Sequence, residues 1–207
     1  MSVRGRICVA RHGETDWNSV GILQGWIDVP LNDKGRRQGH ELAGMLAHWH
    51  FAKVYSSPLS RAAETAEIIA HRLRLPPPTL HEGLKERNFG AVQGRPKAEL
   101  ALTHPGLMEE IVRRNPACIF EQGESPDDFA DRVLAAMKEI AERIAARPVL
   151  IVTHGWVMDV ITRHIHHLPR STILKIKRKN IESVWIDVHG HSTLHAADEH
   201  AIHGVMP

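Results

Sequence analysis

The sequence ICVARHGET occupies residues 7–15, and its character changes abruptly in the middle. Residues 7–10 are apolar and follow a charged N-terminal segment, a pattern that is typical of a short buried strand. Arg11, His12 and Gly13 come directly after this run. The sequence therefore predicts a strand with a histidine at its carboxyl end, followed by a glycine that lets backbone and ligand approach closely.

Two further predicted strands along the chain are also followed by candidate functional residues and a helix. Residues 148–153 form another apolar run, which is followed by His154 and Gly155 and then by a helical pattern over 156–165. A third predicted strand, 53–56, leads through a serine-rich turn to Arg61, near the start of a helix predicted over 60–73. Three predicted strand ends thus carry His12, His154 and Arg61.

The remaining pattern alternates strands and helices. Asn32 and Ser125 are typical N-cap residues, and apolar residues at helical spacing follow each of them. Late strands are predicted over 173–176 and 182–188. This alternation predicts the α/β class, with a mostly parallel sheet flanked by helices on both faces, in a single domain over residues 1–207. The proline-punctuated segment 95–122 is expected to form a lid or insertion with one or two short helices.

The composition excludes several classes of protein. The 207 residues include 26 Lys and Arg against 24 Asp and Glu, a balance that gives no general affinity for nucleic acid or membrane surfaces. Cys8 and Cys118 form no CxxC pair and are expected to be reduced, buried thiols. The N-terminus has no pattern of a secretory signal, so we expect a cytoplasmic location. The chain has 16 histidines, and their spacing near the C-terminus (His189, His191, His195, His200 and His203) matches no standard metal site.

The carboxyl ends of parallel strands meet at one edge of a sheet, where such folds bind ligands. Arg11, Arg61 and the two histidines are therefore expected to converge on one pocket. Guanidinium groups match phosphate oxygens in geometry and charge, and a neutral imidazole can attack phosphorus. Taken singly, each of these residues has an ordinary interpretation as a cap or a surface charge. Their occurrence at three strand ends favours phosphoryl-transfer chemistry.

The motifs resemble those of the histidine phosphatase superfamily, in its phosphoglycerate mutase-like branch. The resemblance begins at Arg11-His12-Gly13-Glu14-Thr15 and extends over nearly the whole chain. The other matching segments are Leu31–Gly35, Ser56–Ala62, Leu84–Gly90 with Gln93 and Gly94, Gly123–Ser125, Arg132 with Val133, and Val152–Gly155. The order and spacing of these segments make the match specific, and it implies the three-layer fold of that branch.

The resemblance also implies roles for individual residues. His12 matches the phosphorylated histidine, and Arg11, Arg61 and His154 match the rest of the phosphate pocket. Glu86 matches the proton donor to the leaving group, although its neighbours Lys85 and Arg87 also allow an exposed ion pair. The expected phosphate- and substrate-binding residues are Asn18, Gln24, Gly25, Arg87, Phe89, Gly155, Arg113 and Arg114. Glu14 is expected to orient an arginine or cap the following turn, and Thr15 to be a cap.

Three functions fit these residues. A phosphatase admits water to the phosphorylated enzyme, whereas a mutase excludes water and grips two anionic ends of its substrate. The mutases of the branch carry a longer insertion than the 28 residues between Gly94 and Gly123, which favours a phosphatase. The alternatives are a phosphoglycerate mutase, in which Arg113 and Arg114 grip the second anionic group, and an inactive binding module. For Arg113 and Arg114 a solvated helix face is the simpler interpretation.

The expected partner is a small phosphate ester. The sequence predicts no cofactor, no metal, no nucleic acid and no membrane, and it leaves a homodimer open.

Overall fold

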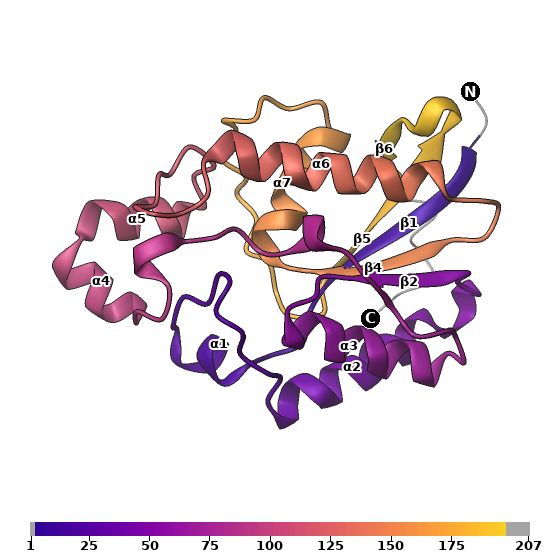
Figure 1. Ribbon diagram of the computed structural model, residues 1–207, viewed down its shortest axis with the longest axis horizontal. Helices are drawn as coiled ribbons and strands as arrows, with labels where there is room; N and C mark the ends of the chain where they lie inside the picture. Colours follow the sequence, from indigo (N-terminus) through magenta and orange to yellow (C-terminus); the bar gives the residue numbers. More distant parts are fainter. Residues whose placement is uncertain (1–2, 198–207) are drawn as a thin grey trace.

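The computed structural model describes residues 3–197 and is built around one six-stranded sheet (Figure 1). The strand order is β3-β2-β4-β1-β5-β6. β1 pairs in parallel with β4, β4 with β2, and β2 with β3, while β5 is antiparallel to both β1 and β6. The strands are β1 (Val3–Arg11), β2 (Lys53–Ser56), β3 (Thr79–Leu80), β4 (Val149–Thr153), β5 (Ser183–His189) and β6 (Leu194–Ala196).

Helices cover both faces of this sheet, which confirms the predicted fold class. α2 (Asp33–Leu46) and α3 (Ser60–Arg72) lie on one face, and α6 (Pro126–Glu142) and α7 (Gly155–Ile165) lie on the other (Figure 1). Alternate side chains of the central strand β1 pack on opposite faces of the sheet. Ile7 and Val9 belong to the core under α6 and α7, whereas Cys8 and Ala10 belong to the core under α2 and α3. A strand buried on both faces is expected to be continuously apolar, as residues 7–10 are.

Local sequence signals set the helix boundaries. The Asn32 side chain accepts a hydrogen bond from the backbone N–H of Gly35, and the Ser125 side chain accepts one from Asp128, so both predicted N-caps are confirmed. The predicted stripe along α6 is buried, from Phe129 to Ile140, and Ile144 beyond the helix is buried with it. The remaining helical elements are α1 (Asp16–Val20), α4 (Lys97–Thr103), α5 (Pro105–Arg113), η1 (Ala47–Trp49), η2 (Glu82–Leu84), η3 (Gly90–Val92) and η4 (Gly190–Ser192).

One predicted strand is wrong. Residues 173–176 form no strand, because β1 already has β4 on one side and β5 on the other, and this segment passes beyond the carboxyl end of β1. The sequence also missed β3 and β6, which are only two and three residues long. One or two short helices were expected within 95–122, and two are present, α4 and α5, which lie together at one end of the molecule (Figure 1).

Cys8 and Cys118 are both free and buried, as expected.

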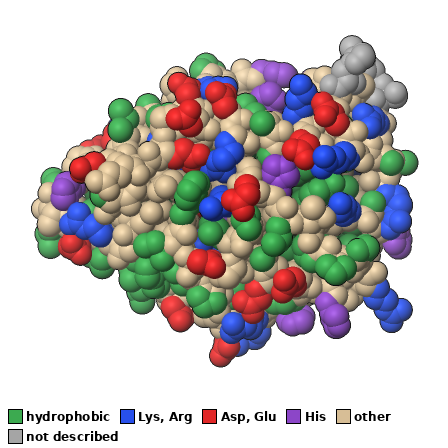
Figure 2. Space-filling view, viewed as in Figure 1, with side chains coloured by type: hydrophobic (Ala, Val, Ile, Leu, Met, Phe, Trp, Pro, Cys, Tyr) green, Lys and Arg blue, Asp and Glu red, His purple; other side chains and the backbone are tan. Residues whose placement is uncertain are grey.

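Among residues 3–197, no helix is long and apolar enough to cross a membrane, and no group of three or more His, Cys, Asp or Glu is arranged to hold a metal ion. His200 and His203 of the C-terminal histidines lie outside the described residues. On the face shown in Figure 2, acidic and basic side chains are interspersed.

The loop after β1 packs directly on the first turn of α2. A Cβ atom added to Gly13 would overlap the backbone of Gly35, and one added to Gly35 would overlap the backbone of Glu14. The backbone N–H of Gly13 also donates to the Thr65 hydroxyl on α3 at 3.1 Å. The position of the loop therefore depends on two glycines that face each other without side chains.

We predict that Gly35→Ala destabilises the fold by about 1–3 kcal/mol, because the added methyl group forces the loop after β1 away from α2. The matched control is Gly44→Ala in the same helix, where a Cβ meets nothing within 4 Å. That change should be neutral or stabilising by up to about 1 kcal/mol, since alanine favours the helix. Urea unfolding measures both, and equal free energies of unfolding for the two variants would contradict the prediction.

Candidate active site

A pocket of about 110 Å³ lies at the carboxyl ends of β1 and β4. The backbone N–H of His12 donates to the carbonyl of Thr153, the last residue of β4, at 3.0 Å. This bond places His12 and His154 beside each other, with their ring centroids 5.1 Å apart. The predicted site residues that line the pocket are Arg11, His12, Asn18, Gln24, Gly25, Arg61, Glu86, Phe89, Arg114 and Gly155.

The surroundings of His12 determine both which ring nitrogen carries the proton and whether the ring is charged. Its Nδ1 atom lies 2.6 Å from the backbone carbonyl of Gly13, which can only accept, so Nδ1 carries the proton. Nε2 is thereby left with a free lone pair. Burial, followed by the charges of Arg61 and Arg11, holds the pKa of His12 well below its usual value. The ring is therefore a neutral imidazole at neutral pH, the form that acts as a nucleophile.

His154 lies deeper in the protein and is fully buried. Its Nε2 atom is 2.8 Å from the Ser57 hydroxyl, and its Nδ1 atom has no hydrogen-bond partner among residues 3–197. Burial, followed by the charges of Arg61, His12 and Arg11, holds the pKa of His154 well below its usual value. When the Ser57 hydroxyl donates to Nε2, the Nδ1–H group of His154 is available to an acceptor.

Two guanidinium groups flank His12. Arg61, in the first turn of α3, donates to the carbonyls of Gly25 at 2.7 Å and Ile27 at 3.1 Å, and Arg11 donates to the Arg178 carbonyl at 2.7 Å. Burial lowers the pKa of each to about 10, so both stay charged at neutral pH. The Nε atoms of Arg11 and Arg61 have no protein partner within the described chain. Buried cations with free donors are suited to hold an anion.

Glu86 is a buried carboxyl group on the same pocket. Its oxygens accept hydrogen bonds from the backbone N–H of Arg87 at 3.0 Å and of Trp156 at 3.5 Å. Burial raises its pKa, with the charge of Arg114 as the largest opposing effect. The exposed ion pair that its sequence neighbours allowed is not formed, because Lys85 lies 3.5 Å from Glu82. Burial thus shifts Glu86 toward the protonated form, which is the form a proton donor needs.

Thr15, Asn18 and Glu14 organise the turn after the motif. Thr15 caps α1 and forms a capping box in which its own backbone N–H donates to the Asn18 side chain. The Glu14 carboxylate accepts hydrogen bonds from the side chains of Asn32 and Lys34. The capping prediction is confirmed for Thr15, whereas Glu14 ties its turn to the start of α2 through side chains.

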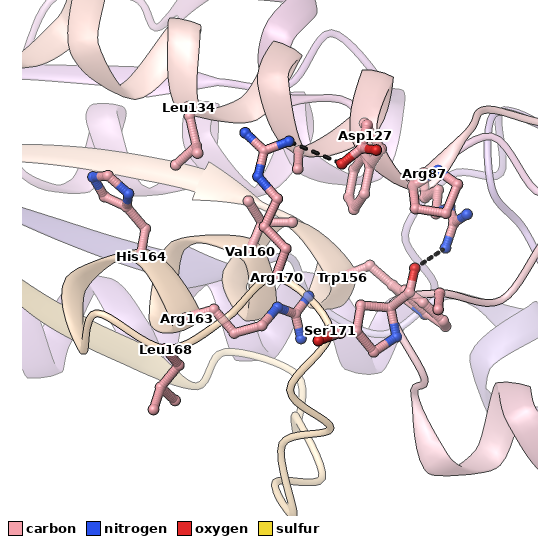
Figure 3. A pocket seen from close by; sticks show the side chains of 15 residues that line it. Arg87, Asp127, Leu134, Trp156, Val160, Arg163, His164, Leu168, Arg170 and Ser171 are labelled. Carbon is pink, nitrogen blue, oxygen red and sulfur yellow. Dashed lines mark hydrogen bonds and ion pairs between the residues drawn. The ribbon is translucent and has the colours of Figure 1, made fainter.

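Arg87 was expected among the phosphate- and substrate-binding residues, but it does not line this pocket. Its fully buried guanidinium group donates to the carbonyls of Pro116, Cys118 and Glu124. Figure 3 shows it in a different cavity, of about 550 Å³, which Trp156 also lines. The physical reason is that the 116–124 segment leaves three carbonyls without other donors nearby, and a guanidinium fork satisfies them together.

Arg113 and Arg114 are adjacent but lie in different surroundings. Arg113 is exposed, pairs with Glu109 and Glu110, and does not line the pocket of His12, so a solvated helix face describes it. Arg114 follows α5 in a left-handed conformation with a φ of 55°, and its Nε atom lies 2.6 Å from Asp159 on α7. Asp159 thus holds Arg114 at the pocket.

The sequence reasoning missed several residues around the site. Asp159 is buried and also pairs with Arg178 at 3.0 Å, while Asn180 donates to the backbone carbonyl of His12 at 2.9 Å. Lys97 lines the pocket as well. One signal was available for Asp159, because a carboxylate within the apolar stretch 156–161 requires a buried cationic partner.

A sheet with a neutral histidine and buried arginines at its carboxyl edge defines a protein that handles phosphoryl groups through histidine. The chain belongs to the histidine phosphatase superfamily (branch 1), whose sequence profile matches residues 7–197. It is 33% identical over 159 residues to the uncharacterized phosphatase PhoE of Bacillus subtilis (strain 168), covering 77% of this chain and 76% of that protein.

Two further relatives represent different activities. The chain is 29% identical over 182 residues to the probable phosphoglycerate mutase GpmB of Yersinia pestis (strain Pestoides F), which covers 88% of this chain and 84% of that protein. Its fold matches the solved native structure of the mycobacterial glucosyl-3-phosphoglycerate phosphatase Rv2419c with a TM-score of 0.82 and 25% identity, over 95% of this chain and 97% of that one. Phosphatases and a mutase therefore both occur among its relatives.

We predict that His12 stays neutral, with the proton on Nδ1, at pH 6.5, where an unperturbed histidine is about half protonated. The depressed pKa moves its protonation to lower pH, so the neutral form is fully present at pH 6.5 and is lost only on further acidification. Nitrogen-15 NMR of labelled histidine side chains, assigned with His12→Ala, measures this directly. A His12 ring that is half protonated at or above pH 6.5 would refute the assignment.

Proposed function

We propose that this protein is a phosphomonoester phosphatase that acts on a small phosphorylated metabolite through a phosphohistidine at His12. The observation that carries the proposal is the neutral His12 ring, whose free Nε2 faces a pocket lined by the charged groups of Arg11 and Arg61. The phosphatases among the relatives of the chain support the same reaction.

In the first step, Nε2 of His12 attacks phosphorus, a nitrogen–phosphorus bond forms, and the ester oxygen–phosphorus bond breaks. The leaving oxygen takes the proton of the Glu86 carboxyl group, so an alcohol departs and a carboxylate remains. Arg11 and Arg61 hold the phosphoryl oxygens during the transfer, and the Nδ1–H group of His154 can donate to one of them.

In the second step, water attacks the phosphorus atom of phosphohistidine and gives a proton to the Glu86 carboxylate. The nitrogen–phosphorus bond breaks, inorganic phosphate leaves, and both residues return to their starting state. Arg11, Arg61 and Arg114 supply the positive charge that stabilises the transferring phosphoryl group, so the mechanism assigns no step to a metal or a cofactor.

The proposal also includes the setting in which the enzyme works. We propose one domain over residues 1–207 that works in the cytoplasm, and the two free, buried thiols suit such a reducing compartment. A homodimer stays a prediction.

The purified protein should release phosphate from p-nitrophenyl phosphate, and His12→Ala should lower this turnover by at least about a thousandfold, because the nucleophile is gone. Rapid quenching should trap an acid-labile, alkali-stable phosphoryl group on His12, located by mass spectrometry. His71→Ala, at an exposed helix position, is the matched control and should behave like the wild type. A phosphoryl group found on another residue would contradict the mechanism, and absence of turnover would favour the inactive binding module.

The second candidate is a phosphoglycerate mutase, which the similarity to GpmB supports. The short 95–122 segment argues against it, since α4 and α5 have only seven and nine residues to close the pocket against water. Incubation with 3-phosphoglycerate and a trace of 2,3-bisphosphoglycerate separates the two activities. Phosphate release should exceed formation of 2-phosphoglycerate, and isomerisation faster than hydrolysis would establish the mutase instead.

Glu86→Gln should slow hydrolysis of alkyl phosphates by about 10²–10⁴-fold, because an alkoxide leaving group needs the donated proton. Turnover of p-nitrophenyl phosphate should fall much less, since its phenolate leaves without protonation. Glu82→Gln, at an exposed carboxylate four residues earlier, serves as the control and should affect neither substrate. Equal losses on alkyl and aryl phosphates in Glu86→Gln would assign Glu86 a structural role.

A further inference from the structure

A cavity of about 1220 Å³ opens directly beside the small pocket of His12. The two share Arg11, Asn18, Lys97, Ile111 and Arg114 in their walls, so they are direct neighbours. The inner part, at about 110 Å³, is suited to a single phosphoryl group. The outer cavity is therefore the place for the rest of a phosphate ester.

The outer cavity is strongly cationic. Its lining includes nine Lys and Arg side chains but only two carboxylates, Glu14 and Glu41. This imbalance contrasts with the mixed charges on the face shown in Figure 2 and with the balanced composition of the chain. Such a cluster repels itself and attracts anions.

Some of these cations are already neutralised within the protein. Lys34 pairs with Glu14, Arg113 with Glu109 and Glu110, and Asp159 bridges Arg114 and Arg178. Within residues 3–197, the other cations of the cavity have no ion-pair partner; they are Arg11, Lys97, Lys175, Lys177 and Lys179. Burial and the charges of Arg11, Arg114 and Lys177 lower the pKa of Lys97, which indicates that these cations lie within interaction range of one another.

Three of the lysines belong to a segment, residues 173–181, that is anchored in the protein. Arg178 is buried, and its guanidinium group donates to Asp159 at 3.0 Å, Glu182 at 2.7 Å and Thr162 at 2.6 Å. The backbone carbonyl of Arg178 accepts a hydrogen bond from Arg11. Lys175, Lys177 and Lys179 are exposed, as is Ile176, whereas Leu174 and Arg178 in the same segment are buried. The contacts of Arg178 therefore hold the segment that carries these lysines in place beside Arg11.

The chemistry of the cavity selects among possible ligands. Several unpaired ammonium groups match a dianionic phosphoryl group better than a single carboxylate, which carries half the charge. Ile111, Leu174 and Ile181 add apolar surface to the lining of the cavity, against which the organic portion of a ligand can pack.

We propose that Lys97, Lys175 and Lys177 bind a second phosphoryl group, so that the preferred substrates are phosphomonoesters whose leaving group itself carries a phosphate. This inference rests on the proposed phosphatase function and names its substrate class. His12 takes the phosphoryl group that enters the inner pocket, and the second one stays bound in the outer cavity and leaves with the alcohol.

The test compares kcat/KM for matched esters, adenosine 3′,5′-bisphosphate against adenosine 5′-monophosphate and fructose 1,6-bisphosphate against fructose 6-phosphate. The bisphosphates should be preferred by at least about tenfold, well above the factor of two that a second hydrolysable group provides. Lys177→Ala should reduce this preference by about tenfold, because one charge-assisted bond to phosphate is lost. Lys138→Ala removes the same charge from the outer surface of α6 and should leave the preference in place.

Equal kcat/KM values for mono- and bisphosphates would overturn the inference, as would a preference that Lys177→Ala and Lys138→Ala reduce equally. A stronger preference for phosphoserine or 3-phosphoglycerate would assign the site to a carboxylate and would overturn it too. Lack of p-nitrophenyl phosphate hydrolysis contradicts the proposed function instead. Calorimetry with His12→Ala then tests the site without catalysis, and it should show tighter binding of adenosine 3′,5′-bisphosphate than of the monophosphate.

Discussion

The parallel pairing of β1 with β4 is the constraint on which the site depends. Arg11 lies opposite Thr153, so the residues that follow, His12 and His154, leave the sheet side by side. Both strands are buried on both faces in their central residues, as their continuous apolar runs predict. The helices on either face bury the two rings, and this burial keeps both histidines uncharged next to arginines.

The elements that the sequence predicted well are those with strong local signals. β1 and β4 are uninterrupted apolar runs, and the starts of α2 and α6 carry capping side chains that satisfy backbone N–H groups locally. The errors fall where tertiary neighbours decide the outcome. Residues 173–176 have the composition of a strand, but β1 is already paired on both sides by β4 and β5, whereas β3 forms because β2 offers it an edge over two residues.

The residues of the predicted site divide in the same way, into those located by a local pattern and those whose position depends on distant partners. Residues next to strand ends, such as His12 and Arg61, were located correctly because the topology alone brings them together. Arg87 and Arg114 could not be distinguished from the sequence, since their placement depends on where their partners lie. Arg87 is drawn to backbone carbonyls 29 to 37 residues away, and Arg114 is held by Asp159, 45 residues away. No local pattern encodes such contacts.

The central position of β1 has a consequence for biosynthesis. This strand is translated well before its two neighbours, β4 and β5, which end at Thr153 and His189. Both of its edges therefore stay unpaired while the residues between β1 and β4 are translated, for on the order of ten seconds at ordinary elongation rates. An apolar strand with free edges is prone to pair with other chains, so newly made protein depends on early burial of residues 7–10 or on chaperones until β4 and β5 emerge.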